Sequence, residues 1–344
     1  MKAVSYIQTG EPDVLTFADV AITEPGTGEV RVAYCRSGVN PADWRTRRGS
    51  SPGTSVIPAR VPGNDGAGIV DAVGEGVDRS LIGSRVWVWE AATTGSGSCQ
   101  EFGLVRSDRM AALPDSASYD LGASLGVPFL TAHRCLTVGE DGPGNLGPGT
   151  LSGRTVLVAG GAGAVGNAAI QLARWSGATV ISTVSGLAKS ELAKAAGAHV
   201  VIDYTIEDVA ERVREVSPAG VDTIAEVAPV ANSSINEAVL GVGGTIAIYA
   251  TDGGADLKLS FVPLMMANAR IQVVMAFGVP APSKMRGVSD INVALAAGAI
   301  GVGADHGLPL HHFRIEDSAD AHAAVEAHSV GKVLIDVRDK WSGR

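Results

Sequence analysis

The spacing of apolar residues changes along the chain and divides the sequence into stretches of different character. Up to about residue 110, short apolar runs alternate with clusters of Gly, Pro and Ser, which is typical of a β-rich domain. Between residues 155 and 277, apolar runs alternate with stretches of helical spacing, which indicates an α/β domain with a parallel sheet. The remaining residues return to short elements. We therefore expect β-rich ends and an α/β middle.

Individual elements follow from the same pattern. Near the N-terminus, strands are predicted at residues 30–34, 67–73 and 85–89, with polar loops at 40–49 and 95–98. Helical spacing covers 119–136, with a break at Pro128, and a Gly- and Pro-rich surface excursion follows at 141–153. In the α/β part we expect strands at 156–159, 179–184, 199–204, 221–227, 245–249 and 271–277 and helices at 165–175, 187–196, 206–216 and 233–240. Helices at 291–297 and 318–327 and a strand at 332–337 complete the prediction.

Composition narrows the class of protein. Of the 344 residues, 46% are hydrophobic and 18% charged, values that favour packed globular domains, about two for this length. The net charge of −9 argues against a nucleic-acid-binding protein, because nothing offsets phosphate charge over an extended face. Three widely spaced cysteines imply no disulfide framework, and the sequence has neither a signal-peptide pattern nor a membrane-spanning run. We expect a cytoplasmic protein that binds no membrane.

A glycine motif organises the α/β part. Gly161, Gly163 and Gly166 fit G-x-G-x-x-G and stand between the predicted strand at 156–159 and the predicted helix at 165–175. Glycines there allow a tight turn, a close approach of backbone N–H groups to a pyrophosphate, and close packing of the helix on the strand. The phosphate charge then lies at the positive end of the helix dipole. The motif predicts dinucleotide binding by Gly161, Ala162, Gly163, Ala164, Val165 and Gly166.

The end of the second predicted strand of this domain bears on which dinucleotide is bound. A fold that selects NAD usually places Asp or Glu there, where the carboxylate binds the ribose 2′-hydroxyl. Here the strand ends in Val184, Ser185 and Gly186, without a carboxylate, and Lys189 follows within one helical turn. A carboxylate would repel a 2′-phosphate, whereas a hydroxyl and an ammonium can bind one. Lys189 by itself is equally consistent with an ordinary exposed lysine. The absence of a carboxylate at the end of this strand is the observation that favours NADPH.

Five further segments, together with the glycine motif, carry a family resemblance. They are 37–49 (SGVNPADWRTRRG), 61–77 (VPGNDGAGIVDAVGEGV), 83–86 (GSRV), 125–136 (LGVPFLTAHRCL) and 331–337 (GKVLIDV). With them the chain resembles, over nearly its whole length, the medium-chain dehydrogenase/reductase superfamily and its zeta-crystallin-type NADPH:quinone oxidoreductases. The resemblance implies an α/β protein with a GroES-like β-rich catalytic domain and an inserted Rossmann domain with a doubly wound parallel sheet. The implied parts are 1–124 (catalytic), 125–282 (Rossmann, NADPH-binding) and 283–344 (return to the catalytic domain).

The resemblance also implies roles for individual residues. Asn40, in the GVNP motif, would lie near the nicotinamide and its ribose, and Thr131, in the LTA motif, would face the nicotinamide or its phosphate. Ser185 and Lys189 would hold the 2′-phosphate, and Tyr204 would lie against the adenosine end. Strand ends of the cofactor domain are where ligands of open α/β sheets bind. Residues expected there, although core packing would explain them equally, are Val227, Tyr249 and Phe277.

Two departures from relatives concern the chemistry. Zinc alcohol dehydrogenases of the superfamily carry Cys at the Asn40 position and His at the Asn64 position, and asparagine is a poor zinc ligand beside these. The chain also lacks a closely spaced four-cysteine cluster for a structural zinc, so we expect no metal. Several quinone reductases carry Tyr where this chain has Arg45, which makes the implied substrate cleft more cationic.

These features predict an NADPH-dependent oxidoreductase that works without zinc. Hydride would pass to a small electrophile that spreads the incoming charge onto oxygen, as quinones and enones do. Asn40 and Arg45 are the catalytic residues expected to donate hydrogen bonds to that oxygen, Asp43 is expected to fix their loop, and solvent would supply the proton. Two alternatives stay open: an enoyl-thioester reductase, and a non-catalytic NADPH-binding or crystallin-like protein. The resemblance further implies a homodimer.

Overall fold

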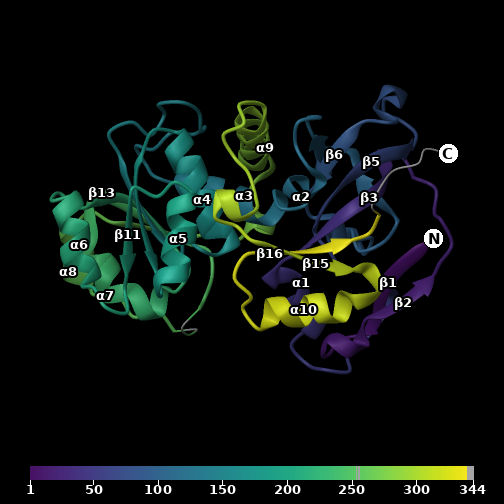
Figure 1. The fold of residues 1–344 in the computed structure, drawn as a ribbon, viewed down its shortest axis with the longest axis horizontal. Coiled ribbons are helices and arrows are strands. Elements are labelled where there is room, and N and C mark those ends of the chain that lie inside the picture. The colour runs from purple at the N-terminus through teal and green to yellow at the C-terminus, as the bar shows by residue number, and fades with distance from the viewer. Residues whose placement is uncertain (253, 255, 339–344) are drawn as a thin grey trace. The chain divides into compact units, whose positions relative to one another are not determined.

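The computed structural model describes residues 1–252, 254 and 256–338, and the chain forms two compact units (Figure 1). Unit 1 contains residues 1–127 and those from 310 onward, and unit 2 contains residues 128–309. The first boundary lies close to the predicted residue 125, whereas the return to unit 1 comes at Leu310 rather than at residue 283. The reason is that α9 (Ala281–Ala296) is held in unit 2, where Asp290 accepts a hydrogen bond from the backbone N–H of Leu146. The predicted part 283–344 also includes residues 339–344, which lie outside the described residues.

Unit 1 is built mainly from antiparallel strands, as its short apolar runs predict. Its strands are β1 (Lys2–Gln8), β2 (Thr16–Asp19), β3 (Glu29–Val39), β4 (Ser55–Arg60), β5 (Asp65–Val73), β6 (Arg85–Val88), β7 (Phe102–Arg106), β8 (Met110–Ala112), β15 (Leu310–Arg314) and β16 (Lys332–Asp336). The larger sheet runs in the order β15-β16-β3-β5-β6-β8, with β7 also on β3, and the smaller sheet is β2-β1-β4. The long strand β3 therefore joins the N-terminal strands to β16 from the end of the chain.

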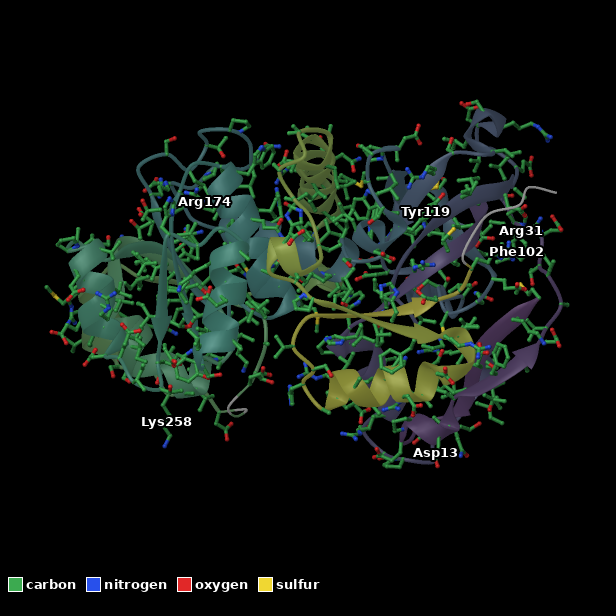
Figure 2. The ribbon with its side chains drawn as sticks, in the orientation of Figure 1. Asp13, Arg31, Phe102, Tyr119, Arg174 and Lys258 are labelled. Atoms are coloured by element: carbon green, nitrogen blue, oxygen red, sulfur yellow. The ribbon has the colours of Figure 1, made fainter. Side chains whose placement is uncertain are left out.

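The strands of unit 1 enclose an apolar core with charged groups at its border. Val30, Val32 and Val70 are buried in this core, which apolar burial stabilises. Figure 2 shows Arg31 and Phe102 side by side, and the guanidinium carbon lies 5.7 Å from the ring centroid. Arg31 also forms an ion pair of 2.6 Å with Asp71. The long side chain thus ties β3 to β5 and β7 at the edge of the core.

The polar loop predicted at residues 40–49 is wrong, because Pro41–Arg48 form the helix α1. The stretch has no apolar stripe that would reveal a helix, but Pro41 stands at its first turn, where a missing N–H costs nothing. The helix is stabilised by contacts with other elements of unit 1. Arg47 is fully buried and pairs with Glu326 of α10 (Ser318–Glu326), so two charged side chains anchor the helix.

The break predicted at Pro128 is also misplaced. The helical stretch consists of α2 (Tyr119–Gly122) and α3 (Gly126–Leu136), and the chain leaves the helical conformation between them. Pro128 lies in the first turn of α3, where the backbone nitrogen needs no helical partner. A proline at that position starts a helix rather than ending one.

Unit 2 has the doubly wound parallel sheet that the sequence predicts. Its strands are β9 (Thr155–Ala159), β10 (Thr179–Val184), β11 (Val200–Asp203), β12 (Val221–Glu226), β13 (Leu240–Ile248) and β14 (Arg270–Val273), and its sheet helices are α4 (Ala164–Trp175), α5 (Leu187–Ala195), α6 (Val209–Val216), α7 (Pro229–Val239) and α8 (Phe261–Met266). The strand order β11-β10-β9-β12-β13-β14 is that of a dinucleotide-binding fold. Figure 1 shows α4 and α5 on one face of this sheet and α6 and α7 on the other. The order reverses between β9 and β12, which opens a crevice at their carboxyl ends.

Candidate functional site

The glycine loop after β9 is fixed by close packing. Gly160 has a positive φ of 71°, which a side chain would strain. A Cβ on Gly161 would lie 2.0 Å from Oγ of Ser182, and one on Gly166 would lie 2.3 Å from the carbonyl oxygen of Gly160. Both distances are far below van der Waals contact. Two of the motif's glycines are therefore required by the packing of α4 against β9 and β10.

Gly163 differs, because the fold leaves room for a side chain there. It is exposed and caps the N-terminus of α4, and the nearest atom to an added Cβ is the carbonyl oxygen of Gly160 at 3.5 Å. The open space lies where the first N–H groups of a 12-residue helix, those of Ala164 and Val165 among them, lack helical acceptors. Such an N-terminus fits a pyrophosphate. The structure thus brings together all six predicted loop residues, including the buried Ala162.

The predicted 2′-phosphate residues lie together at the end of β10. The ammonium of Lys189 donates to Oγ of Ser185 over 2.9 Å, which places a cation and a hydroxyl side by side. Tyr204 follows β11 with 54% of its surface exposed, and its backbone N–H donates to the carbonyl of Val184. This group of side chains suits a phosphate-bearing ribose.

Asp203 was not predicted and lies beside these residues. Its carboxylate accepts hydrogen bonds from the backbone N–H of Gly186 and from the N–H and hydroxyl of Thr205. The bond from the Thr205 hydroxyl is the main cause that lowers the pKa of Asp203 below its ordinary value. Three donors therefore occupy the acid that stands near Lys189, and its role is to hold the turn at Gly186. The feature of the sequence that could have indicated Asp203 is an acid at the end of the third strand of this domain, β11, rather than of the second, β10.

A pocket lies at the same edge of the sheet. Its lining includes Thr183, Tyr204, Glu226 and Asn232. Glu226 is fully buried and accepts hydrogen bonds from the amides of Asn232 and Asn236, so it fixes the orientation of Asn232. Sequence reasoning missed both Glu226 and Asn232, since a single acid at a strand end and an asparagine in a helix are common.

The remaining predicted cofactor residues of unit 2 take different places. Val227 directly follows β12, and its Cγ1 would lie 3.1 Å from a Cβ on Gly160. Tyr249 follows β13, and its N–H donates to the carbonyl of Glu226. The strand predicted at 271–277 ends at Val273, so Phe277 lies beyond a strand end, in a short 3-10 helix. Each of these three is half-buried, whereas Thr131 is buried within α3.

In unit 1, Asn40 follows β3 and is the N-cap of α1, so it lies at a helix start rather than in a loop. The backbone N–H of Asn40 donates to Asp43 over 2.8 Å. The other carboxylate oxygen of Asp43 accepts from the backbone N–H of Asn64 at 3.0 Å and from its side-chain amide at 2.7 Å. The prediction that Asp43 fixes this segment is confirmed by these bonds.

The side chain of Asn40 is held by two residues that sequence reasoning missed. Its carbonyl Oδ1 accepts a 2.7 Å hydrogen bond from the ammonium of Lys332, and its Nδ2 donates to Asp65 over 2.8 Å. The ammonium of Lys332 lies 3.6 Å from the same Asp65 oxygen. The second oxygen of Asp65 accepts from the backbone N–H of Val127. These contacts define a cluster of Asn40, Asp43, Asn64, Asp65 and Lys332.

Burial dominates the electrostatics of this cluster. It raises the pKa of Asp43 to about 6, with the neighbouring charge of Asp65 adding to the rise and the donors above opposing it. Burial likewise raises the pKa of Asp65 and lowers that of Lys332, and the opposite charge of the partner moderates each effect. The cluster thus holds an ammonium between two buried carboxylates, and the Asn40 amide bridges the ammonium and one of them.

Arg45, the second predicted catalytic residue, lies on the exposed side of α1. Its guanidinium carbon is 5.3 Å from the ring centroid of Trp44, and that of Arg48 is 5.1 Å from the same centroid. Stacking of this kind holds a cation in place at modest cost in solvation. The helix therefore presents a cationic surface around an indole ring.

The positions that hold zinc in relatives do not fit a metal ion in this chain. Oδ1 of Asn40 already faces an ammonium, and the amide of Asn64 donates to Asp43. Among the residues that the structure describes, no three His, Cys, Asp or Glu side chains are grouped as metal ligands would be. The described residues also form no helix with the length and apolarity needed to cross a membrane.

Comparison with known proteins places the chain in a family. Residues 26–128 match the family described as alcohol dehydrogenase GroES-like domain, and residues 164–292 match the one described as zinc-binding dehydrogenase. The rat quinone oxidoreductase is 30% identical over 260 residues, which cover 75% of each chain. The chain belongs to the medium-chain dehydrogenase/reductase superfamily, in its zeta-crystallin-type branch. It is therefore an oxidoreductase.

Solved structures of this superfamily share the fold over almost the whole chain. The mycobacterial protein Rv1454c, in complex with NADPH, is 30% identical and superposes with a TM-score of 0.79 over 97% of this chain and 99% of its own. An NAD-dependent alcohol dehydrogenase is 26% identical, with a TM-score of 0.83 over 98% of this chain and 100% of its own. Members of the superfamily with this fold thus use either dinucleotide, and the choice depends on side chains near the ribose.

Proposed function

We propose that the protein is an NADPH-dependent reductase that transfers hydride, without a metal, to a quinone or to the activated C=C bond of an enone. The observation that carries the proposal is the pairing of Lys189 with Ser185 beside the open N-terminus of α4. A helix N-terminus binds a pyrophosphate, and an ammonium with a hydroxyl binds a further phosphate. NADPH has both groups, whereas NADH lacks the second. The NADPH complex of the mycobacterial relative supports the same assignment.

The cofactor site of the proposal uses residues at the carboxyl edge of the parallel sheet. The loop from Gly161 to Gly166 binds the pyrophosphate, and Ser185 and Lys189 bind the 2′-phosphate. The carboxylate of Asp203 stays ionised, but its hydrogen bonds direct it to the backbone of Gly186 and to Thr205, and the ammonium of Lys189 supplies the positive charge that the phosphate needs. Tyr204, which is exposed after β11, takes the adenosine end. The other cofactor-binding residues, toward the nicotinamide, are Val227, Tyr249, Phe277 and Thr131.

The chemistry follows from the choice of acceptor. When bound, the reduced nicotinamide supplies the hydride. A quinone or enone accepts it at carbon or oxygen and places the negative charge on an oxygen, which a proton from water then neutralises. Asn40 and Arg45 donate hydrogen bonds toward that oxygen and so lower the barrier. The conjugated acceptor carries its own electron sink, so turnover needs no metal ion at the positions of Asn40 and Asn64.

The proposal includes a homodimer formed by the exposed apolar surface of α8 and β14. This surface consists of Phe261, Val262, Met265, Met266 and Val273, each more than half exposed. In the described part of the chain, β14 is the last strand of its sheet, so one edge of its backbone is open to another strand. An apolar edge of this kind is costly in water unless a second copy covers it.

In solution we expect a mass of twice the 35.0 kDa of one chain, measured by light scattering. Val273→Asp should shift the protein toward the monomer, because a carboxylate would be buried in the interface. Ile206→Asp is the matched control, since Ile206 is 82% exposed on the same unit but outside this surface. A monomeric wild type at micromolar concentration would contradict the dimer.

The proposed function is tested by following consumption of NADPH with a panel of quinones, enones, enoyl thioesters and aldehydes. We expect turnover with quinones or enones. Turnover of enoyl thioesters alone would assign the enzyme to the alternative reductase class. Binding of NADPH without turnover of any electrophile would favour a non-catalytic protein.

A further inference from the structure

The buried ion pair of unit 1 lies on the strands that carry Asn40. Lys332 begins β16, Asp65 begins β5, and Asn40 follows directly after β3, which lies between them in the sheet. The register fixes their approach, because Val39 pairs with Val333 and Gly38 pairs with Asp65. All three side chains are at most 2% exposed. Residues far apart in sequence are therefore brought to one end of adjacent strands.

Gly38 makes room for the lysine. A Cβ at Gly38 would lie 3.0 Å from Cε of Lys332 and 2.0 Å from the carbonyl oxygen of Ala123. The lysine stem thus passes directly over the glycine, and its ammonium reaches both the carbonyl of Val39 at 3.4 Å and Oδ1 of Asn40 at 2.7 Å. The backbone at Gly38 therefore leaves space for the Lys332 side chain, so its ammonium is directed at the amide oxygen of Asn40 from within the core.

The two partners of Asn40 distinguish the two ends of its amide. An ammonium can only donate hydrogen bonds and a carboxylate can only accept them. If the amide turned by 180°, its NH₂ would face the ammonium of Lys332 and its oxygen would face the carboxylate of Asp65. Both contacts would be repulsive in a buried site, where polar mismatches are costly. Only one orientation of the Asn40 side chain is therefore compatible with its surroundings.

We propose that Lys332 is a positioning residue that, together with Asp65, locks the Asn40 amide so that its second N–H is presented as a hydrogen-bond donor. One amide hydrogen is given to Asp65, and the ammonium draws electron density toward Oδ1, which strengthens the remaining N–H as a donor. The catalytic consequence rests on the proposed function, in which Asn40 donates to the acceptor oxygen. The orientation itself belongs to the protein alone.

A buried ion pair does not by itself indicate a stabilising role. Taking a lysine and an aspartate out of water costs much of what their attraction returns, and apolar replacements of both are often neutral for stability. The third charged group of the cluster is Asp43, whose carboxylate accepts from the backbone N–H of Asn40. Orientation of the Asn40 amide is thus the effect that Lys332 supplies together with Asp65.

The test is a double-mutant cycle between Asn40 and Lys332. We expect Lys332→Met to lower kcat roughly 10- to 100-fold with little change in the Kd for NADPH, because the donor remains but is no longer aimed. In an Asn40→Ala background, the same change should cost no more than about a further twofold. Lys332→Arg, which keeps a donor cation, should recover part of the loss. Lys194→Met, at an exposed lysine of α5, is the control and should behave as wild type.

A second measurement does not need the cofactor or activity. The ¹H–¹⁵N signal of the Asn40 side-chain amide, assigned by its loss in Asn40→Ala, should be shifted and protected from exchange in the wild type. Lys332→Met should remove that protection. If Lys332→Met alone fails to fold, Asp65→Asn/Lys332→Met removes both charges of the ion pair and serves in its place. Losses that simply add in the cycle, or an amide signal unchanged by Lys332→Met, would overturn the positioning role. A wild type without reductase activity would defeat the proposed function and leave the amide measurement to decide the orientation.

Discussion

Asn40→Ala is expected to lower kcat by about 10²-fold, the usual size for loss of a preorganised donor, while the KM for NADPH changes little. The reason is that, in the proposed function, the Asn40 amide stabilises charge that develops only as hydride arrives on the acceptor. Removing the side chain leaves Lys332 and Asp65 3.6 Å apart and able to pair directly, so the fold should persist. Steady-state kinetics with a quinone and an enone, together with the unfolding temperature, measure both effects.

Arg45→Ala is the companion variant, and a smaller loss is expected because Arg45 is exposed. Its distinct effect should be on acceptor charge, since the cations around Trp44 favour acceptors that carry an anionic group. The ratio of kcat/KM for carboxylated over neutral acceptors should fall in Arg45→Ala and depend on salt concentration.

Should Asn40→Ala raise KM without lowering kcat, Asn40 would be a binding residue and the catalytic assignment would fail.

NADPH is expected to bind at least tenfold more tightly than NADH, a difference of about 1.4 kcal/mol, and Lys189→Ala should remove most of that gap. The lysine ammonium and the Ser185 hydroxyl lie 2.9 Å apart and can share the extra phosphate, which NADH lacks. Fluorescence titration of both dinucleotides into wild type and variant measures the effect. Equal affinities in the wild type would contradict the assignment of these two residues.

Gly163→Ala provides a matched control for that titration. The fold accepts a methyl group there, because the nearest atom would be 3.5 Å from it, whereas the space in front of α4 would be reduced. Gly163→Ala should therefore weaken NADPH and NADH by the same factor, while Lys189→Ala weakens NADPH alone. A fold that tolerates Gly163→Ala with unchanged affinity for both would show that the pyrophosphate binds elsewhere.

The sequence was most informative where apolar runs carry the structure. β10 begins and ends at the predicted residues 179 and 184, and β9 and α4 each differ from their predictions by a single residue. These elements are buried, so their side chains repeat with the period of the element. By contrast, α1 has a polar sequence and depends on the pairing of Arg47 with Glu326, which no local pattern reveals.

The candidate site was predictable only in part in both units, since Asp203, Glu226 and Asn232 of unit 2 were missed as well. The loop from Gly161 to Gly166 and the pairing of Ser185 with Lys189 are local in sequence, so spacing alone places them. Lys332, Asp65 and Asn40 meet through strand register across the whole chain, and sequence separation hid that cluster. The signal that could have found it is a lysine at the start of an otherwise apolar strand, KVLID.

The central claim is hydride transfer from NADPH to a conjugated acceptor without a metal. Its most direct test is the initial rate of NADPH oxidation by chelator-treated wild-type protein, with a quinone, an enone and an aldehyde compared side by side and zinc measured by elemental analysis. The account predicts turnover of the quinone or the enone, none of the aldehyde, no stoichiometric zinc and a rate that chelation does not change. Aldehyde reduction that is lost on chelation and restored by zinc would contradict it.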